Sequence, residues 1–90
     1  MLRVWFRVMR HNKIVEETVT ESALADEAAA MAQALQASCL AFDIARPLWL
    51  SLNERDIERY RRTTLTQDNF MEHIAFDKLE IEILEEDSDS

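Results

Sequence analysis

The sequence predicts a small α+β domain, in which an antiparallel sheet carries its helices on one face. Two runs of alternating apolar and polar residues, 2–9 and 76–84, have the two-residue period of a strand, and residues 23–45 have the 3.6-residue period of a helix. We expect three strands, with one long helix and one or two short helices packed on one face. Residues 47–50 are extended and apolar, and whether they add a fourth strand stays open.

The first strand is expected at residues 2–9, with one buried face. That face carries Leu2, Val4, Phe6 and Val8, and the opposite face carries Arg3, Trp5, Arg7 and Met9. His11-Asn12 predicts a tight reversal, because asparagine tolerates the left-handed backbone that a short hairpin needs. A second strand is expected over residues 13–20, where valine and threonine favour a pleated surface.

A long helix is expected over residues 23–45, which contain ten alanines and no helix-breaking residue. Its apolar stripe consists of Leu24, Ala28, Met31, Leu35, Cys39 and Phe42. Ser22 is expected to cap its first turn. The helix should end by Ala45, because Pro47 excludes helical geometry at the residue before it.

The second half of the chain is expected to contain a polar helix and then the closing strand. Ser51 and Glu54 fit a capping box at the start of this helix, which should reach Arg62. A loop and a short helical turn are expected over residues 63–74, before the strand at 76–84. These elements make residues 1–84 one domain, followed by an acidic, disordered tail at residues 85–90.

The closing strand is expected to pair beside the first strand, which then becomes central. In that arrangement two arginines face two glutamates on the outer side of the sheet, namely Arg3 and Arg7 against Glu80 and Glu82. Opposite charges across neighbouring strands contribute about 0.2–1 kcal/mol per pair. Glu16 is expected on the other side of the first strand, so much of the basic charge near the N-terminus would be neutralised inside the sheet.

Trp5, Arg3 and Arg7 form the first candidate interaction surface. A tryptophan between two arginines is either covered by their guanidinium planes or used as an anchor for another protein, and both interpretations stay open.

Arg55, Arg59 and Arg62 form the second candidate, because their i, i+4 and i+7 spacing places them on one stripe of the polar helix. Such a stripe binds phosphates or pairs with the acids interleaved with it, and the net charge of the chain favours pairing.

Composition excludes several classes of site. The chain has no glycine, so it lacks the loops that bind nucleotides or calcium through glycine backbone conformations. One cysteine, Cys39, excludes an internal disulfide framework, and its place on the apolar stripe favours core packing over a nucleophile. The histidine at position 73 is expected on the surface. We therefore expect no catalytic residue, metal or cofactor.

Charge and hydropathy bear on partners and compartment. The net charge of −8 should repel nucleic acid and anionic membranes at long range. No apolar run approaches the length of about 20 residues that a membrane helix needs, and the first residues do not have the pattern of a signal peptide. With a single cysteine, these features favour a protein of the cytoplasm.

Three stretches resemble a family of short acidic bacterial proteins of unknown function. They are FDIARPLWL at 42–50, TQDNF at 66–70 and FDKLEIEILEED at 76–87. The resemblance implies a bacterial, cytoplasmic setting and supplies no catalytic residue.

We therefore expect a non-enzymatic protein–protein interaction module with an acidic surface and an unidentified protein partner. A homodimer stays open. The alternative is a small nucleic-acid-binding or phosphate-binding protein that uses the arginine stripe, although the net charge disfavours nucleic acid as a partner.

Overall fold

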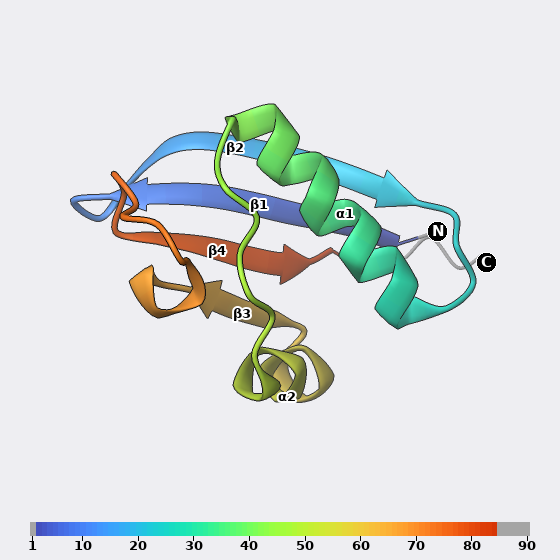
Figure 1. Cartoon of the computed structure of the whole chain (residues 1–90). Coiled ribbons are helices and arrows are strands. Elements are labelled where there is room, and N and C mark those ends of the chain that lie inside the picture. Colours follow the sequence, from blue (N-terminus) through green and yellow to red (C-terminus); the bar gives the residue numbers. More distant parts are fainter. Residues whose placement is uncertain (1, 85–90) are drawn as a thin grey trace.

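A computed structural model describes residues 2–84 and shows a four-stranded antiparallel sheet with two α-helices. The elements in chain order are β1 (Leu2–Arg10), β2 (Lys13–Ser22), α1 (Glu27–Phe42), α2 (Ser51–Tyr60), β3 (Arg62–Leu65), the 3-10 helix η1 (Gln67–Asn69) and β4 (Lys78–Ile83). The strand order is β2-β1-β4-β3; α1 crosses one face of the sheet and α2 lies beside β3 (Figure 1). The predicted α+β class is confirmed. The expected tail at residues 85–90 lies outside the described residues.

The β1–β2 hairpin and the central place of β1 agree with the prediction. β1 pairs with β2 on one side and with β4 on the other. His11 and Asn12 both have positive φ angles, 54° and 63°, as a type I′ turn requires. The four predicted inward side chains of β1 are all buried. The predicted inward side chains of β4 are also buried, on the same face of the sheet.

A bulge in β2 changes which glutamate faces the central strand. Val8 lies opposite Glu16, but the next pair is Met9 with Ile14, so Val15 is the extra residue of the bulge. As a result Glu17, and not Glu16, lies opposite Arg7. The expectation for Glu16 was wrong by one residue.

The long helix is shorter than expected at both ends. It begins at Glu27, and its cap is Asp26, whose carboxylate accepts a hydrogen bond from the Ala29 amide at 3.0 Å. Ser22 is instead the last residue of β2, and its hydroxyl donates to Gln33 of α1. The helix ends at Phe42 because Asp43 adopts the left-handed conformation, with φ at 57°.

The fourth strand is β3, at a place where a loop was expected. α2 ends at Tyr60, because Arg61 is left-handed with φ at 59° and turns the chain into β3. Residues 47–50 remain extended without joining the sheet. The expected box between Ser51 and Glu54 is also wrong, since Leu50 holds the cap position and its amide donates to the side chain of Asn53 at 3.1 Å.

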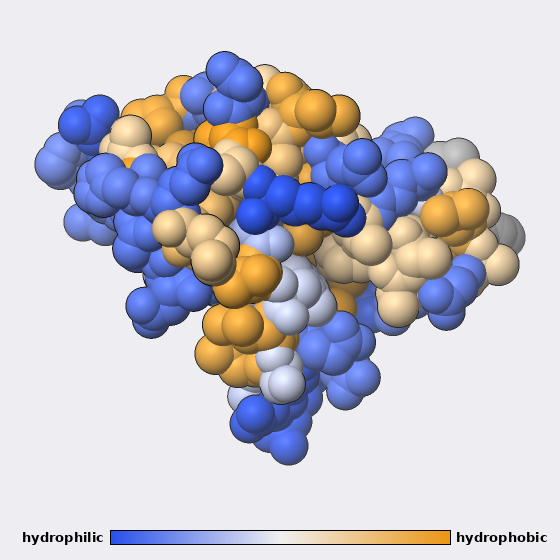
Figure 2. Space-filling view, in the orientation of Figure 1, coloured by the Kyte–Doolittle hydropathy of each residue, from blue (hydrophilic) through white to orange (hydrophobic). Residues whose placement is uncertain are grey.

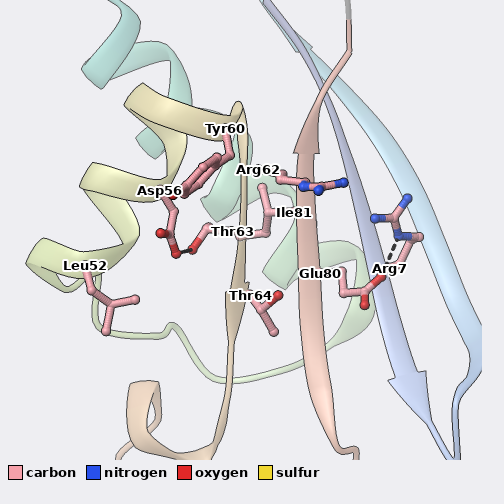
Figure 3. Close-up of a pocket in the computed structure, with 9 residues that line it drawn as sticks. All are labelled: Arg7, Leu52, Asp56, Tyr60, Arg62, Thr63, Thr64, Glu80 and Ile81. Carbon is pink, nitrogen blue, oxygen red and sulfur yellow. Dashed lines mark hydrogen bonds and ion pairs between the residues drawn. The ribbon is translucent and has the colours of Figure 1, made fainter.

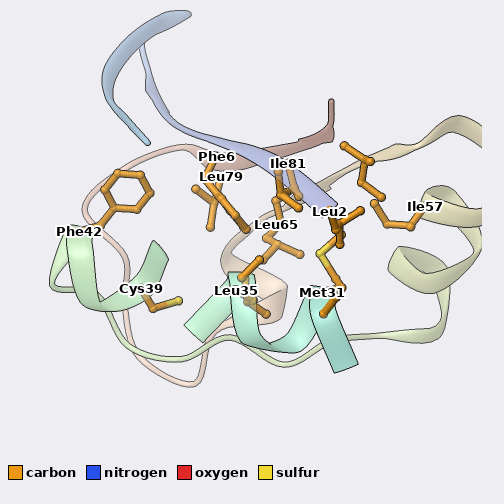
Figure 4. Packing of buried hydrophobic residues seen from close by; sticks show 14 of the residues in the cluster. Leu2, Phe6, Met31, Leu35, Cys39, Phe42, Ile57, Leu65, Leu79 and Ile81 are labelled. Carbon is orange, nitrogen blue, oxygen red and sulfur yellow. The ribbon is translucent and has the colours of Figure 1, made fainter. Parts of the chain in front are cut away.

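The core lies between the sheet and the helices. Side chains of β1, β3 and β4, including Phe6, Leu65 and Ile81, point toward the buried face of α1, and Ile57 adds the contribution of α2 (Figure 4). The buried residues of α1 are Ala30, Met31, Ala34, Leu35, Ser38, Cys39 and Phe42. The sheet face opposite α1 is called the outer face below.

A buried hydrogen-bond network joins the second half of the chain. Asn53 is 1% exposed; its amide donates to the Thr63 hydroxyl at 2.9 Å and to the Thr64 carbonyl at 3.3 Å. The side-chain amide of Asn69 donates to the side-chain oxygen of Asn53 at 2.8 Å and to the backbone carbonyl of Leu48 at 2.9 Å. The network therefore ties α2, β3, η1 and the extended segment to one another.

Replacing Asn53 with alanine should destabilise the fold strongly. The change leaves buried backbone and side-chain groups without partners, which should lower the free energy of unfolding by about 3 kcal/mol. Urea denaturation of Asn53→Ala and the native chain measures this difference. Gln36→Ala, on the exposed side of α1, is the control and should stay within about 0.5 kcal/mol. Equal losses in the two variants would contradict a structural role for the network.

Candidate functional site

Arg7 is the centre of the outer face of the sheet. Its Nε donates to Glu80 at 3.0 Å and its Nη1 donates to Glu82 at 3.1 Å, so one guanidinium engages two glutamates of β4. The Arg7 side chain is only 15% exposed. The cross-strand pairing expected for Arg7 is thus confirmed, and this cation is engaged within the protein itself.

Trp5 is held on the outer face by the same arginine and by β2. The Arg7 guanidinium lies 4.2 Å from the centre of the Trp5 ring, within the range of a cation–π contact. The indole Nε1 donates to Glu17 at 2.9 Å. Of the two interpretations of Trp5, the structure shows the first: the guanidinium of Arg7 covers the Trp5 ring. The ring is nevertheless half-buried, and part of it stays accessible.

The charges of the outer face are balanced. By strand register, this face carries Arg3, Arg7, Arg62 and Lys78 together with Glu17, Glu21, Glu80 and Glu82. Arg3 lies opposite Glu21, and Lys78 is 3.4 Å from Glu80. The alternation of signs leaves no strong field of either sign, so this face does not favour a highly charged ligand.

Exposed apolar side chains lie beside Trp5 on β2. Val19 is 50% exposed and lies directly opposite Trp5, and Ile14 is 45% exposed and lies opposite Met9. The four side chains, Trp5, Met9, Ile14 and Val19, make up what we call the outer strip. Sequence reasoning missed this strip because the bulge at Val15 places Ile14 and Val19, which would lie on opposite faces of a regular strand, on the same face, and a bulge leaves little trace in a sequence.

The three arginines of the second candidate surface do not share one helix. Arg55 and Arg59 are exposed on α2, but Arg62 is the first residue of β3. The neighbouring Arg61 pairs with Glu27 of α1 at 2.9 Å. The expected helical stripe is therefore wrong, because the helix ends two residues before Arg62.

A groove of about 620 Å³ lies where α2 meets the outer face. Leu52, Asp56 and Tyr60 project from α2, Arg62 belongs to β3, and Arg7 lies on β1, beyond β4 (Figure 3). Asp56 accepts a hydrogen bond from Thr63 at 3.0 Å, and Glu80 accepts one from Arg7. The groove therefore contains cations beside carboxylates, which does not favour a phosphate.

Cys39 is placed as expected for a core residue. It is 5% exposed on the buried face of α1. Burial raises the pKa of the Cys39 thiol, although a hydrogen bond with Ser38 and the charge of Arg46 act in the opposite direction. A raised pKa keeps the thiol protonated and less nucleophilic at neutral pH.

Residues 2–84 contain neither a metal-binding cluster nor a membrane-spanning helix. No three histidine, cysteine or acidic side chains in this part of the chain are grouped so that they could hold a metal ion. Neither of its α-helices has the length and apolar character needed to cross a bilayer.

Comparison with known proteins finds no matching family model, no matching curated protein and no matching solved structure. The outer strip, the groove and the buried network are therefore interpreted from the chemistry of this chain.

The pairing of Arg7 with Glu80 should be measurable as a coupling between the two residues. In a double-mutant cycle of Arg7→Gln and Glu80→Gln, we expect a coupling of about 1 kcal/mol, because both side chains are partly shielded from water. Unfolding free energies of the four chains give this value. A cycle of Arg55→Gln with Glu80→Gln is the control and should show no coupling. If Arg7 and Glu80 showed no coupling, this result would contradict the role of Arg7 in pairing β1 with β4.

The buried thiol predicts a pH dependence of stability. Because burial raises the pKa of Cys39 in the folded chain, the thiol in the unfolded chain ionises first as the pH rises. Its stabilising contribution is complete below the pKa of the unfolded thiol and is lost as the pH rises through the folded value. Urea midpoints of the native chain should therefore fall more steeply with rising alkaline pH than those of Cys39→Ala. Parallel curves would contradict this expectation.

Proposed function

We propose that this protein is a non-enzymatic interaction module that binds a partner protein on the outer strip. The observation that carries the proposal is that half-buried Trp5 lies opposite the exposed Val19, while the exposed Ile14 lies further along the same face, opposite Met9, on the side of the sheet away from α1. Exposed apolar side chains that lie together on one face are typical of protein interfaces. Tryptophan and arginine are the residue types that interfaces use most often as anchors.

The chemistry of the strip indicates the kind of partner. Around the apolar centre, the charged side chains are engaged with one another, as in the contacts of Arg7 with Glu80 and Glu82. Binding there would bury apolar area without stripping water from unpaired charges, whose burial is costly. A partner with an apolar patch of its own fits this surface, and a second copy of the chain is one such partner.

The alternative, a nucleic-acid or phosphate binder, has less support. It would depend on Arg55, Arg59 and Arg62, which lie on two different elements and are accompanied by Asp56 and Glu58. The net charge of −8 would also oppose the approach of a polyanion.

The outer strip can be tested with a paired substitution and a matched control. We expect Ile14→Ser combined with Val19→Ser to abolish capture of the partner protein from an extract of the native cell, because the anchor area is lost. Leu40→Ser is the control, since Leu40 is 76% exposed on α1, on the other side of the sheet. Quantitative affinity capture measures both. Sedimentation of the purified chains detects a second copy as the partner.

The outcomes separate the two candidate functions. Loss of one captured protein, or of self-association, in the strip variant and not in Leu40→Ser supports the proposal. Identical captured proteins in all chains would overturn it. Oligonucleotide binding that weakens steeply with salt and is lost in Arg59→Glu would favour the alternative.

A further inference from the structure

A second cavity lies between the two helices, on the opposite side of the molecule from the outer strip. It has a volume of about 300 Å³ and is lined by α1, by α2 and by Arg46, Pro47 and Trp49 of the extended segment that connects them. In the space-filling view, tan surface of α1 lies beside the pale surface of this connection, with blue side chains above and below them (Figure 2). We call this cavity the interhelical cleft.

The walls of the cleft are apolar and come from three elements. They are Ala28, Met31, Ala32 and Leu35 of α1, Pro47 and Trp49 of the connection, and Ile57 of α2. Alanines on α1 leave room that a larger side chain would fill. A volume of this size is at the lower limit for small-molecule sites and suits one large aliphatic or aromatic group.

Trp49 is held in place as one wall. Its indole Nε1 donates to Glu54 at 2.9 Å, and the ring packs against the hydrophobic core while remaining partly exposed. The side chain of the buried Asn69 donates to the backbone carbonyl of the adjacent Leu48 at 2.9 Å, and this hydrogen bond fixes the backbone next to Trp49. The wall is therefore set before any ligand binds, which lowers the entropic cost of binding.

The rim of the cleft is predominantly acidic. Glu27, Glu54 and Glu58 line it, against one cation, Arg46. Glu27 pairs with Arg61 at 2.9 Å and Glu54 accepts from Trp49, but Glu58 has no ion-pair partner among residues 2–84. An incoming basic group would therefore find an available carboxylate beside an aromatic face, a combination that favours cations.

We propose that the interhelical cleft binds a basic amphipathic segment of a partner protein, with one large apolar side chain in the cleft and a lysine or arginine beside Glu58. The apolar walls require the first feature and the acidic rim requires the second. A negatively charged segment would be repelled both by the rim and by the net charge of −8. This site is separate from the outer strip and does not depend on it.

The test uses Trp49 as its own reporter. The chain has two tryptophans, so Trp5→Phe leaves Trp49 as the single indole and also removes the indole of the outer strip. The probe is a short amphipathic peptide of leucine and lysine, titrated while the emission of Trp49 is recorded. We expect a saturable change in emission. Peptides of leucine and glutamate, and of serine and lysine, should produce none.

Two matched pairs of variants assign the binding to the cleft. Ala32→Leu fills the cleft and should weaken binding about tenfold, whereas Ala41→Leu, also exposed on α1 but outside the cleft, should have no effect. Glu58→Lys should weaken binding severalfold more than Glu16→Lys, although both change the net charge equally.

Several results would overturn the proposal. They are an unchanged emission, equal binding of the serine and lysine peptide, and equal effects of the two members of either variant pair. These results report on the cleft and not on the outer strip, because the emission comes from Trp49 and the substituted Ala32 and Glu58 both line the cleft. A failure here would leave the strip proposal to its own test, and a failure of the strip would leave the cleft unaffected.

Discussion

The buried pair Asn53 and Asn69 is the constraint on which the second half of the fold depends. Residues 44–50 are mostly apolar but only Pro47 among them is buried, and α2 buries only Asn53 and Ile57. The two amides bond to backbone groups of the extended segment, of β3 and of Thr66 before η1, so these elements can lie together without leaving these groups unpaired. The network fixes α2 to its neighbours, and side chains of α2 line both the groove beside β3 and the cleft beside α1.

The first half of the fold depends on a different kind of interaction. β1 lies between two partners that both carry acids on the outer face, and its arginines neutralise them. Arg7 satisfies two glutamates of β4 while its plane covers Trp5. In an acidic chain this arrangement has a consequence for function. Arg3 and Arg7 face acids across the strands, so they do not form an anion site.

The sequence is most informative where side chains alternate. β1 and β4 could be predicted with their buried faces because each alternates over six or more residues, and the charge pairing across them could be predicted as well. β3 could not, since four residues contain too little of a period to distinguish a strand from a loop. The bulge at Val15 and the network of Asn53 were also missed. The bulge lies within a local hairpin but leaves little trace in the sequence, and the network joins segments up to 21 residues apart.

The arginine stripe shows how an error in one boundary changes a functional interpretation. Extending α2 by two residues placed Arg62 on the same helical face as Arg55 and Arg59, and the left-handed Arg61 removes that alignment. With the cations distributed over separate elements, the accessible features that remain are apolar: the outer strip and the interhelical cleft. They differ in their surroundings, because the strip lies among paired charges and the cleft lies under an acidic rim. Association through the strip should therefore depend little on ionic strength, whereas binding in the cleft should weaken as salt screens the rim.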